Sequence, residues 1–477
     1  MTDKVFENIT ILDAGSEGKA IAKIGELVIF VPFVVPGDVV DIQLVRKKKS
    51  YLEGKAIRFH KYSEKRQEAF CEHFGTCGGC RWQNMKYEDQ LFYKQKQVKE
   101  AIQRIGKIEN AKILPILPSP ESIYYRNKLE YSFSNHRWLI PGDRTEGGRV
   151  DENGMNALGF HIPLLFDKVL DIKHCYLQAD PSNAIRLEAR KYAMERNLSF
   201  YDVRIWKGFL RNLLIRTTMT GNVMVIFVFR TDDKEEIEQL LDHMLAKFSE
   251  ITSMYYVING KKNDVITDLP FIHYHGNPYI NEKMITFNEE KEIEFHIRPA
   301  SFFQTNTKQA FTLYRKAGEC AGFIGNETVY DLYCGIGTIS SFIAGSVKKV
   351  IGIESVPSAV DDARENAQRN GITNTSFFSG EAEKLLTLEF IEQQGKPDII
   401  ITDPPRAGMH EKVVKAILNA APQKIVYVSC NPATQARDIA LIKEQYELIG
   451  CQPVDMFPHT QHVENIALLG KKIPLTL

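Results

Sequence analysis

The strongest constraint on the fold is a series of short apolar runs after residue 300, which alternate with helix-forming sequence. The first run, residues 328–333, leads into the turn Cys334-Gly335-Ile336-Gly337-Thr338. Apolar strands that alternate with helices are typical of a parallel sheet buried on both faces. Ligands of such sheets bind beyond the carboxyl ends of the strands. We therefore expect a C-terminal α/β domain with its site at that edge.

The glycines of this turn indicate a cofactor site, because they let the backbone bend sharply and approach a ligand closely. A second strand, residues 350–354, ends in Glu354, and a carboxylate there can accept both hydroxyls of a ribose. The pattern Asp-x-x-x-Gly-x-Gly, which begins at Asp331, resembles motif I of the class I methyltransferases. This resemblance implies a Rossmann-like domain that uses S-adenosylmethionine; a nicotinamide-dependent enzyme is the alternative.

A third strand, residues 398–402, leads into Asp403-Pro404-Pro405-Arg406. The two prolines stiffen a turn that can hold a carboxylate at the mouth of the pocket. Capping of the next helix by Asp403 is the alternative role. In enzymes that methylate amino groups, this motif normally ends in an aromatic residue, so Arg406 argues against that class.

The fourth strand, residues 424–428, delivers Cys430 to the same edge of the sheet. The C5 carbon of uracil is too weak a nucleophile to attack a sulfonium methyl group directly. Addition of a thiolate to C6 makes C5 an enolate carbon that can do so. The adduct must then lose its C5 proton and expel the cysteine, which requires a base. The sequence therefore predicts that Cys430 is a nucleophile; a buried cysteine at a strand end is the alternative.

Four segments resemble signatures of the RNA uracil-5-methyltransferases, particularly the RumA-type enzymes that act on 23S ribosomal RNA: DLYCGIGT, DPPRAG, SCNPATQARD and DMFPHTQHVENIALL. The resemblance implies that Cys430 is the nucleophile and that Glu464 is the general base. It also implies four residues that bind the cofactor, namely Gln304, Tyr333, Glu354 and Asp403. Without the resemblance, His459 and His462 would be equal candidates for the base.

Four of the eight cysteines form a metal-binding pattern. Cys71, Cys77 and Cys80 surround a Gly-Gly turn, and Cys175 lies far downstream. Four thiolates can hold either zinc or a [4Fe–4S] cluster. Zinc sites more often use two close pairs, so the three-plus-one spacing favours iron–sulfur, with zinc as the alternative. The RumA-type resemblance likewise implies that these four cysteines bind a [4Fe–4S] cluster.

The first 62 residues contain β-rich runs separated by glycine and proline, at residues 21–24, 27–32, 39–45 and 54–59. Short strands at this density suggest a five-stranded barrel of the oligonucleotide-binding type. The segment VIFVPFVVPGDVVDIQLVRKKKSYLEGKAI resembles the TRAM domain of several RNA-modifying enzymes. Residues 41–66 hold nine Lys or Arg and three acids. Such a run suits contact with an RNA backbone, or is simply a solvated face.

A chain of 477 residues is too long for one hydrophobic core. We expect three domains: a TRAM-like barrel (1–62), an α+β middle domain that carries the cysteine cluster (63–300), and a C-terminal doubly wound methyltransferase domain (301–477). Residues 86–115 are expected to pack against the last of these. The chain has no apolar run long enough to span a bilayer and no secretory signal, which favours a cytoplasmic protein. A monomer is expected.

The predicted function is methylation of a uridine at C5 in 23S ribosomal RNA. A transfer-RNA uridine methyltransferase is the alternative within this class, although many such relatives lack the barrel and the four cysteines. A non-catalytic RNA-binding protein with a zinc or iron–sulfur module is the alternative from another class. The presence of both Cys430 and Glu464 at motif-matching positions argues against that alternative.

Overall fold

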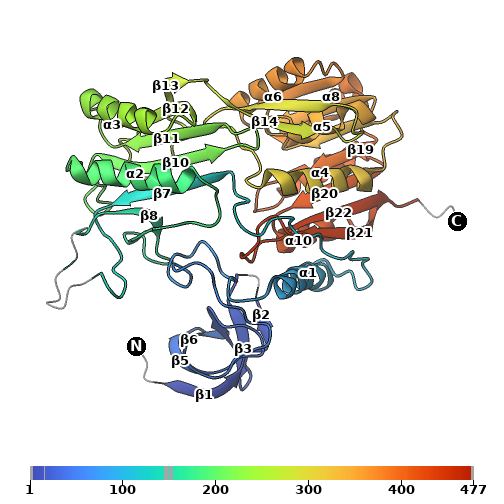
Figure 1. The fold of residues 1–477 in the computed structure, drawn as a ribbon. Coiled ribbons are helices and arrows are strands. Elements are labelled where there is room, and N and C mark those ends of the chain that lie inside the picture. The colour runs from blue at the N-terminus through green and yellow to red at the C-terminus, as the bar shows by residue number, and fades with distance from the viewer. Residues whose placement is uncertain (1–3, 16, 144–149, 151–153, 474–477) are drawn as a thin grey trace.

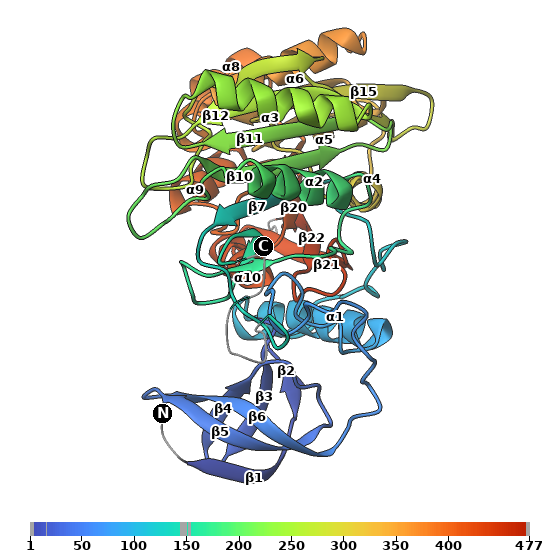
Figure 2. The same cartoon turned by 60° about the vertical axis from the view of Figure 1, so that its left-hand side comes forward.

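The structure is a computed structural model that describes residues 4–15, 17–143, 150 and 154–473. Figure 1 shows a small N-terminal sheet below two larger lobes that lie side by side. Helix α1 (Tyr87–Arg104) lies between the small sheet and the lobes in both Figure 1 and Figure 2. Among the described residues, none of the helices has the length and apolar character needed to cross a bilayer.

The N-terminal sheet has six strands rather than the five expected, in the order β1-β5-β6-β4-β3-β2. The four predicted strands are all present, and β1 and the short β2 are added to them. The sequence did not reveal β1 because most of its residues are exposed, so it lacks a clear apolar pattern. The strands are β1 (Val5–Thr10), β2 (Asp13–Ala14), β3 (Ala20–Ile24), β4 (Leu27–Val31), β5 (Val39–Lys47) and β6 (Tyr51–Lys61).

The middle lobe is built on a seven-stranded sheet in the order β13-β12-β11-β10-β7-β8-β9. Helices α2 (Ser182–Glu195) and α3 (Lys234–Lys247) cover one face (Figure 1). The strands are β7 (Lys128–Ser134), β8 (Ala157–His161), β9 (Val169–Asp171), β10 (Leu210–Thr217), β11 (Val223–Phe229), β12 (Ile251–Ile258) and β13 (Ile272–Gly276). Every residue of β11 is buried, because this strand lies at the centre of the sheet with both faces covered.

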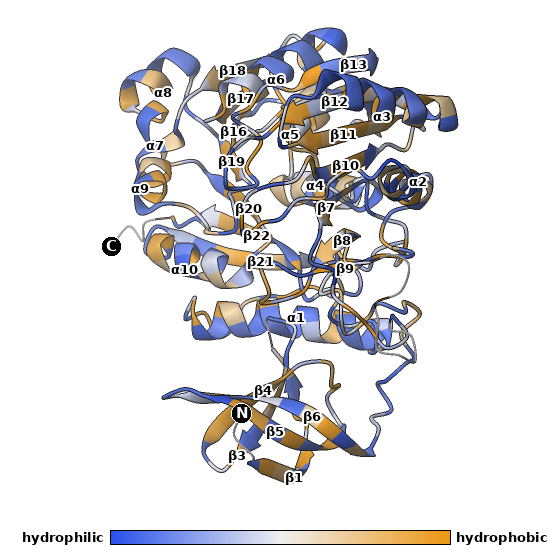
Figure 3. Ribbon diagram, turned by 90° about the vertical axis from the view of Figure 1, so that its left-hand side faces the viewer, coloured by the Kyte–Doolittle hydropathy of each residue, from blue (hydrophilic) through white to orange (hydrophobic). Residues whose placement is uncertain are grey.

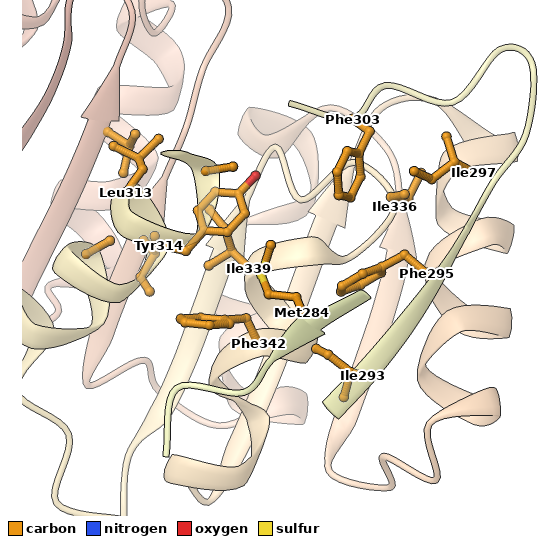
Figure 4. Packing of buried hydrophobic residues seen from close by; sticks show 14 of the residues in the cluster. Met284, Ile293, Phe295, Ile297, Phe303, Leu313, Tyr314, Ile336, Ile339 and Phe342 are labelled. Atoms are coloured by element: carbon orange, nitrogen blue, oxygen red, sulfur yellow. The ribbon is translucent and has the colours of Figure 1, made fainter. Parts of the chain in front are cut away.

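The second face of this sheet packs toward the C-terminal lobe through the hairpin β14 (Ile280–Ile285) and β15 (Glu292–Ile297). Met284, Ile293 and Phe295 of the hairpin pack with Phe342 of the C-terminal lobe (Figure 4). Residues of β10 and β11 belong to the same buried cluster. The two lobes therefore share one hydrophobic core.

The C-terminal lobe contains a seven-stranded sheet in the order β18-β17-β16-β19-β20-β22-β21. Its first five strands are parallel. Strand β22 is antiparallel to both of its neighbours, β20 and β21, so β21 runs in the same direction as the first five. The strands are β16 (Thr328–Leu332), β17 (Lys349–Glu354), β18 (Thr375–Ser379), β19 (Ile399–Thr402), β20 (Lys424–Ser429), β21 (Tyr446–Val454) and β22 (Glu464–Lys471). The four strands expected from the sequence are present, and β22 is inserted between β20 and β21.

Helices cover both faces of this sheet, as expected of a doubly wound fold. One face carries α4 and α5, and the other carries α7 to α10 together with α1. The helices are α4 (Thr307–Ala321), α5 (Thr338–Ile343), α6 (Pro357–Arg369), α7 (Ala382–Leu385), α8 (Leu388–Gln394), α9 (Glu411–Ala420) and α10 (Pro432–Ile442), with the short 3-10 helix η1 (Ala344–Ser346) after α5.

Helix α1 packs against α10 through Val98 and Ile102, both fully buried. The segment that follows it also lies on the C-terminal lobe, where the Leu114 N–H donates to the Cys451 carbonyl at 2.9 Å. Figure 3 shows that α1 is largely hydrophilic, whereas β10, β11 and the central C-terminal strands are hydrophobic. The helix nevertheless buries two polar side chains, and these contact the candidate active site.

Candidate active site

Cys430 lies on a fixed turn between β20 and α10. Asn431 caps α10, because its side chain accepts the Ala433 N–H at 3.1 Å, and Pro432 occupies the first helical turn. The Ser429 hydroxyl accepts the Asn431 N–H at 3.1 Å. The Cys430 side chain is half-buried, so the turn presents a thiol at the carboxyl edge of the sheet without enclosing it.

Glu464 lies on the neighbouring strand, because it is the first residue of β22 and the next residue, Asn465, pairs with Ser429 of β20. Burial, followed by the charges of Glu464 and Asp403, raises the pKa of Cys430 to about 11. Burial and the charge of Asp403 raise the pKa of Glu464 well above its ordinary value. The thiol and two carboxyl groups therefore occupy one buried, acidic pocket.

Asp403 has no cation close enough to hold it ionised among the residues that the structure describes. Burial and the nearby Asp331 raise its pKa to about 7. Asp331 is fully buried, and burial raises its own pKa to about 7, although the Ser340 hydroxyl donates to it at 2.6 Å. The other oxygen of Asp331 has no hydrogen-bond partner in the part of the chain that the structure describes. This edge of the sheet therefore suits a ligand that carries positive charge.

Arg406 supplies the positive charge of the pocket, and its charge lowers the pKa of both Cys430 and Glu464. Its backbone carbonyl accepts hydrogen bonds from the Asn431 amide and the Thr434 hydroxyl, at 3.1 and 3.2 Å. These bonds dock the loop that follows β19 onto α10. The sequence alone did not indicate Arg406 as a residue of the pocket, because the docking of this loop onto α10 brings its side chain there.

His462 accepts a hydrogen bond from Arg406, since the guanidinium Nη2 lies 2.6 Å from the imidazole Nδ1. A guanidinium can only donate, so Nδ1 carries the lone pair. Burial and the charge of Arg406 lower the pKa of His462 to about 4. His462 is therefore neutral at pH 7 and already committed to this contact.

The glycine turn after β16 is open on one side. A Cβ atom added at Gly335 would meet nothing within 4 Å, and φ of +54° places this residue in the left-handed region. Glu354 lies beside it, with Oε2 accepting the Gly335 N–H at 3.1 Å and Oε1 accepting the Val356 N–H at 2.9 Å. The turn and Glu354 thus border free space at the edge of the sheet, as a bound nucleoside would require.

Gln304 lies in the segment before α4, and Tyr333 directly follows β16. Gln304 is buried, and its carbonyl accepts the Asn127 amide of the middle lobe at 2.9 Å. Tyr333 is half-buried at φ +65°, and its nearest charges are Glu383, Asp438 and Glu354. Burial raises the pKa of Tyr333 to about 12.

Tyr314 of α4 is a further residue of the pocket that the sequence did not indicate. It is fully enclosed, and burial raises its pKa well above the ordinary value, with contributions from Asp403, Asp331 and Glu464. Gln304 also contacts it. A tyrosine in the middle of an amphipathic helix carries no sequence signal that distinguishes it from a core residue.

The four cysteines of the metal pattern surround one cavity of about 700 Å³. Burial, with a smaller contribution from the nearby Cys175 and Cys71 thiols, raises the pKa of Cys77 to about 12. A zinc ion would need sulfur atoms about 3.8 Å apart, given a Zn–S bond of about 2.3 Å. As they lie, no three His, Cys, Asp or Glu side chains among the described residues could hold a metal ion. The four cysteines therefore line a common cavity without converging on a preformed ion site.

The loop that leads into Glu464 is held by Gln90 of α1. The Gln90 Oε1 accepts the His459 N–H at 2.8 Å, and its Nε2 lies 3.2 Å from the His459 Nδ1. The His459 carbonyl accepts the N–H groups of Arg81 and Trp82, at 2.9 and 3.0 Å. Burial lowers the pKa of His459 to about 4, so its ring is neutral.

Lys94 of α1 holds the start of the same loop. Its Nζ lies 2.6 Å from the Asp455 Oδ1 and 3.0 Å from the Phe457 carbonyl, and the side chains of both Lys94 and Asp455 are 0% exposed. The Tyr87 hydroxyl donates to the other Asp455 oxygen at 2.8 Å. The loop between β21 and β22 is thus fixed by α1 and by the residues directly after Cys80.

A class I methyltransferase fold whose pocket combines a thiol with buried carboxyl groups defines the class of protein, and comparisons with known proteins define the family. The profile of the tRNA (Uracil-5-)-methyltransferase family matches residues 214–472, and that of the TRAM domain matches residues 7–57. The chain therefore belongs to the tRNA (uracil-5-)-methyltransferase family. It is an S-adenosylmethionine-dependent RNA (uracil-5-)-methyltransferase, as the sequence predicted.

Relatives match along almost the whole chain. An RNA methyltransferase from Bacteroides thetaiotaomicron is 52% identical over 95% of this chain and 99% of its own length. An RNA methyltransferase from Porphyromonas gingivalis is 50% identical over 96% of this chain and 98% of its own length. The solved structure of Pyrococcus abyssi tRNA (uracil-54, C5)-methyltransferase, in complex with S-adenosyl-L-homocysteine, is 26% identical and has a TM-score of 0.74. That match covers 96% of this chain and 99% of the other.

Proposed function

We propose that this enzyme methylates C5 of a uridine in 23S ribosomal RNA through a covalent adduct between Cys430 and C6, with Glu464 as the general base. One observation carries the proposal: the thiol at the end of β20 and the carboxyl group at the start of β22 meet in one pocket. The other candidate bases are occupied, because His459 is bound by Gln90 and His462 by Arg406. Glu464 is the remaining candidate.

The reaction proceeds through addition of a thiolate, transfer of the methyl group, and removal of the C5 proton with expulsion of the thiolate. The Cys430 thiolate forms a bond to C6, and the electrons of the C5=C6 bond move into the enolate. S-adenosylmethionine supplies the methyl group as an electrophile. After C5 has bonded to the methyl group, ionised Glu464 accepts the C5 proton, the C5=C6 bond reforms and the thiolate leaves. Arg406 favours the ionised forms of both Cys430 and Glu464.

We assign cofactor binding to Gln304, Tyr333, Glu354 and Asp403. The open space over Gly335 and the carboxylate of Glu354 beside it suit a ribose. The half-buried carboxyl group of Asp403 and the buried one of Asp331 suit a sulfonium cation. These observations support the assignment.

We assign Cys71, Cys77, Cys80 and Cys175 as ligands of a [4Fe–4S] cluster. The support is that all four cysteines line one cavity, as ligands of a common group would. Protein purified without oxygen should contain about four irons per chain and absorb visible light. Stoichiometric zinc without iron would contradict the assignment.

The choice of 23S ribosomal RNA rests on the four cysteines and the barrel that this chain shares with the RumA-type pattern. Transfer RNA is the second candidate, because the solved relative from Pyrococcus abyssi acts on it. The proposal places the enzyme in the cytoplasm, where ribosomes form, and treats it as a monomer because one chain supplies every residue used. Mapping 5-methyluridine in both RNAs from a deletion strain tests the choice: loss from transfer RNA alone would refute the ribosomal target.

The nucleophile is tested by Cys430→Ala. This variant should lose methyl transfer and covalent capture of RNA, while binding of S-adenosylmethionine, measured by calorimetry, remains. Cys451→Ala, at a buried cysteine of the same lobe outside the pocket, is the matched control and should retain transfer. Undiminished turnover by Cys430→Ala would refute the assignment.

A further inference from the structure

An exposed tryptophan lies on the middle lobe, in the loop between α2 and β10. Trp206 is 40% exposed and has a φ of +55°, a conformation that residues other than glycine rarely adopt. The loop is nevertheless tightly held, because the backbones of Asp202 and Lys207 bond to each other at 2.6 and 3.3 Å. Arg230 also donates to the Trp206 carbonyl at 3.3 Å. Strain that the surroundings enforce in this way is typical of functional sites.

The tryptophan borders a hollow of about 640 Å³ whose lining, within the described part of the chain, holds four cationic side chains and no acidic ones. The cations are Lys207, Arg230, Lys261 and Lys262. The Lys262 ammonium lies 3.9 Å from the centroid of the indole ring, and both Lys207 and Lys262 are exposed. An aromatic face among cations is the combination that binds single-stranded nucleic acid.

The hollow is remote from the catalytic pocket. It lies at the start of β10, while the end of that strand approaches the pocket through Asn127, which accepts the Thr217 N–H at 2.9 Å and donates to Gln304. Eight strand residues span about 27 Å. The loop also lies outside the family match, which begins at residue 214.

We propose that Trp206, Lys207 and Lys262 form a second RNA contact, which binds an unpaired nucleotide of the substrate away from the target uridine. The base stacks on the exposed face of the indole, and the two ammonium groups neutralise the flanking phosphates. RNA is the occupant because it is the substrate of this family and because the charged side chains that line the hollow are all cationic. The contact gives the enzyme a preference for long, folded RNA over short fragments.

The test compares two substrates: full-length RNA that the wild type methylates, and a short hairpin that contains only the target uridine and its stem. Trp206→Ala should raise KM for the full-length RNA by about fivefold or more, with kcat unchanged. KM for the hairpin should not change, because the hairpin cannot reach the hollow. Trp206→Phe should restore most of the affinity, since phenylalanine still stacks.

Charge variants test the contact without altering the loop. Lys207→Ala and Lys262→Ala should each lower the salt dependence of full-length RNA binding by about 0.7 in the log–log slope. Lys191→Ala, an exposed lysine of α2, is the matched control and should change nothing. Equal losses on both substrates, or an unchanged KM for full-length RNA in a folded Trp206→Ala variant, would overturn the proposal. If the hollow binds a protein partner instead of RNA, the KM for full-length RNA should be unchanged in the Trp206→Ala variant. The wild type's activity on 23S and transfer RNA decides the target separately.

Discussion

Among single residues, the environment of Cys430 has a consequence for when the nucleophile forms. Burial, followed by two carboxyl groups, raises the pKa of the thiol to about 11 and one guanidinium lowers it, so the thiol is protonated in the ligand-free enzyme at pH 7. A bound sulfonium would add positive charge to this pocket and favour the thiolate. On the proposed mechanism, the thiolate of Cys430 would then be favoured once the methyl donor is bound.

The first prediction concerns the pH dependence of Cys430 alkylation. Only the thiolate reacts, and the pKa is raised from 9.0 to about 11, so the rate should rise with pH until about 11. Reaction with iodoacetamide, followed by mass spectrometry of the peptide that contains Cys430, measures the rate. Arg406→Ala should slow the reaction further at pH 8, and Arg406→Lys should slow it less. A rate that levels off at pH 9 or below would contradict the assigned environment.

Cys430, Glu354 and Asp403 stand at the carboxyl ends of parallel strands, where the topology of such a sheet predicts a ligand site. Gln304 lies in the segment before α4, and only family resemblance indicated it. Resemblance alone also separated Glu464 from His459 and His462. The structure supplies the physical reason, since both histidines are neutral and bound. Arg406 and Tyr314 were not predicted, because a loop docked on α10 and a helix packed under the sheet bring them to the pocket.

At the level of elements, α1 joins the cysteine segment to the loop of the proposed base. A helix with so hydrophilic a sequence is expected on a surface, yet Gln90 and Lys94 are fully buried. Their bonds to His459 and Asp455 fix a loop that has no regular structure of its own. Helix α1 therefore fixes the loop that precedes the proposed base.

The second prediction follows from this positioning. Gln90→Ala should slow removal of the C5 proton by about tenfold, the effect of losing one or two hydrogen bonds, while the earlier steps proceed. The methylated RNA should then remain attached to Cys430 and appear as a slow band on a denaturing gel. Gln103→Ala, on the exposed side of α1, is the control. Slower turnover without accumulated adduct would contradict a positioning role.

The third prediction concerns stability. Lys94→Met leaves the Asp455 carboxylate buried without its cation, and should lower the free energy of unfolding by about 3–5 kcal/mol. Lys96→Met, on the same helix as Lys94, removes a partly exposed ion pair with Asp13 of β2. This change should lower the free energy of unfolding by less than about 1 kcal/mol. Urea denaturation measures both. Equal losses would show that the buried pair has no special contribution.

The parallel strands were predicted closely because continuous apolar runs bounded by turn residues identify buried strands. The direction of β22 and its position between β20 and β21 were not predicted, because an apolar run does not indicate which strands will lie beside it. The hairpin β14–β15 was also missed. Its alternating burial is a weak signal beside the longer helices around it.

At the level of the whole molecule, the barrel presents cations on a surface separate from the pocket. Arg46, Lys47 and Lys49 are exposed at the end of β5 and in the turn that follows. The small sheet lies below α1 (Figure 2), and its turn at Gly18 lies beside Gln461 of the loop that leads into Glu464. The barrel therefore borders the loop of the proposed base.

The fourth prediction tests the barrel as an RNA-binding surface. The double variant Lys47→Glu, Lys49→Glu should weaken RNA binding at low salt and make the log–log salt slope shallower, by about 0.7–0.9 for each phosphate that the protein no longer neutralises. Filter binding at several salt concentrations measures the slope. Lys384→Glu, at an exposed lysine of α7, is the control. An unchanged slope would show that the basic run is only a solvated face.

The position of β22 between β20 and β21 has a consequence for how the chain folds as it is synthesised. This strand is made from residues 464–471, whereas the groups that hold the loop before it come from Arg81, Trp82, Gln90 and Lys94. A chain still being translated lacks the strand that closes the sheet and presents Glu464. The barrel, the cysteine segment and α1 are therefore all made before the strand that completes the sheet, and the sheet can close only after β22 inserts between two strands that precede it in the chain.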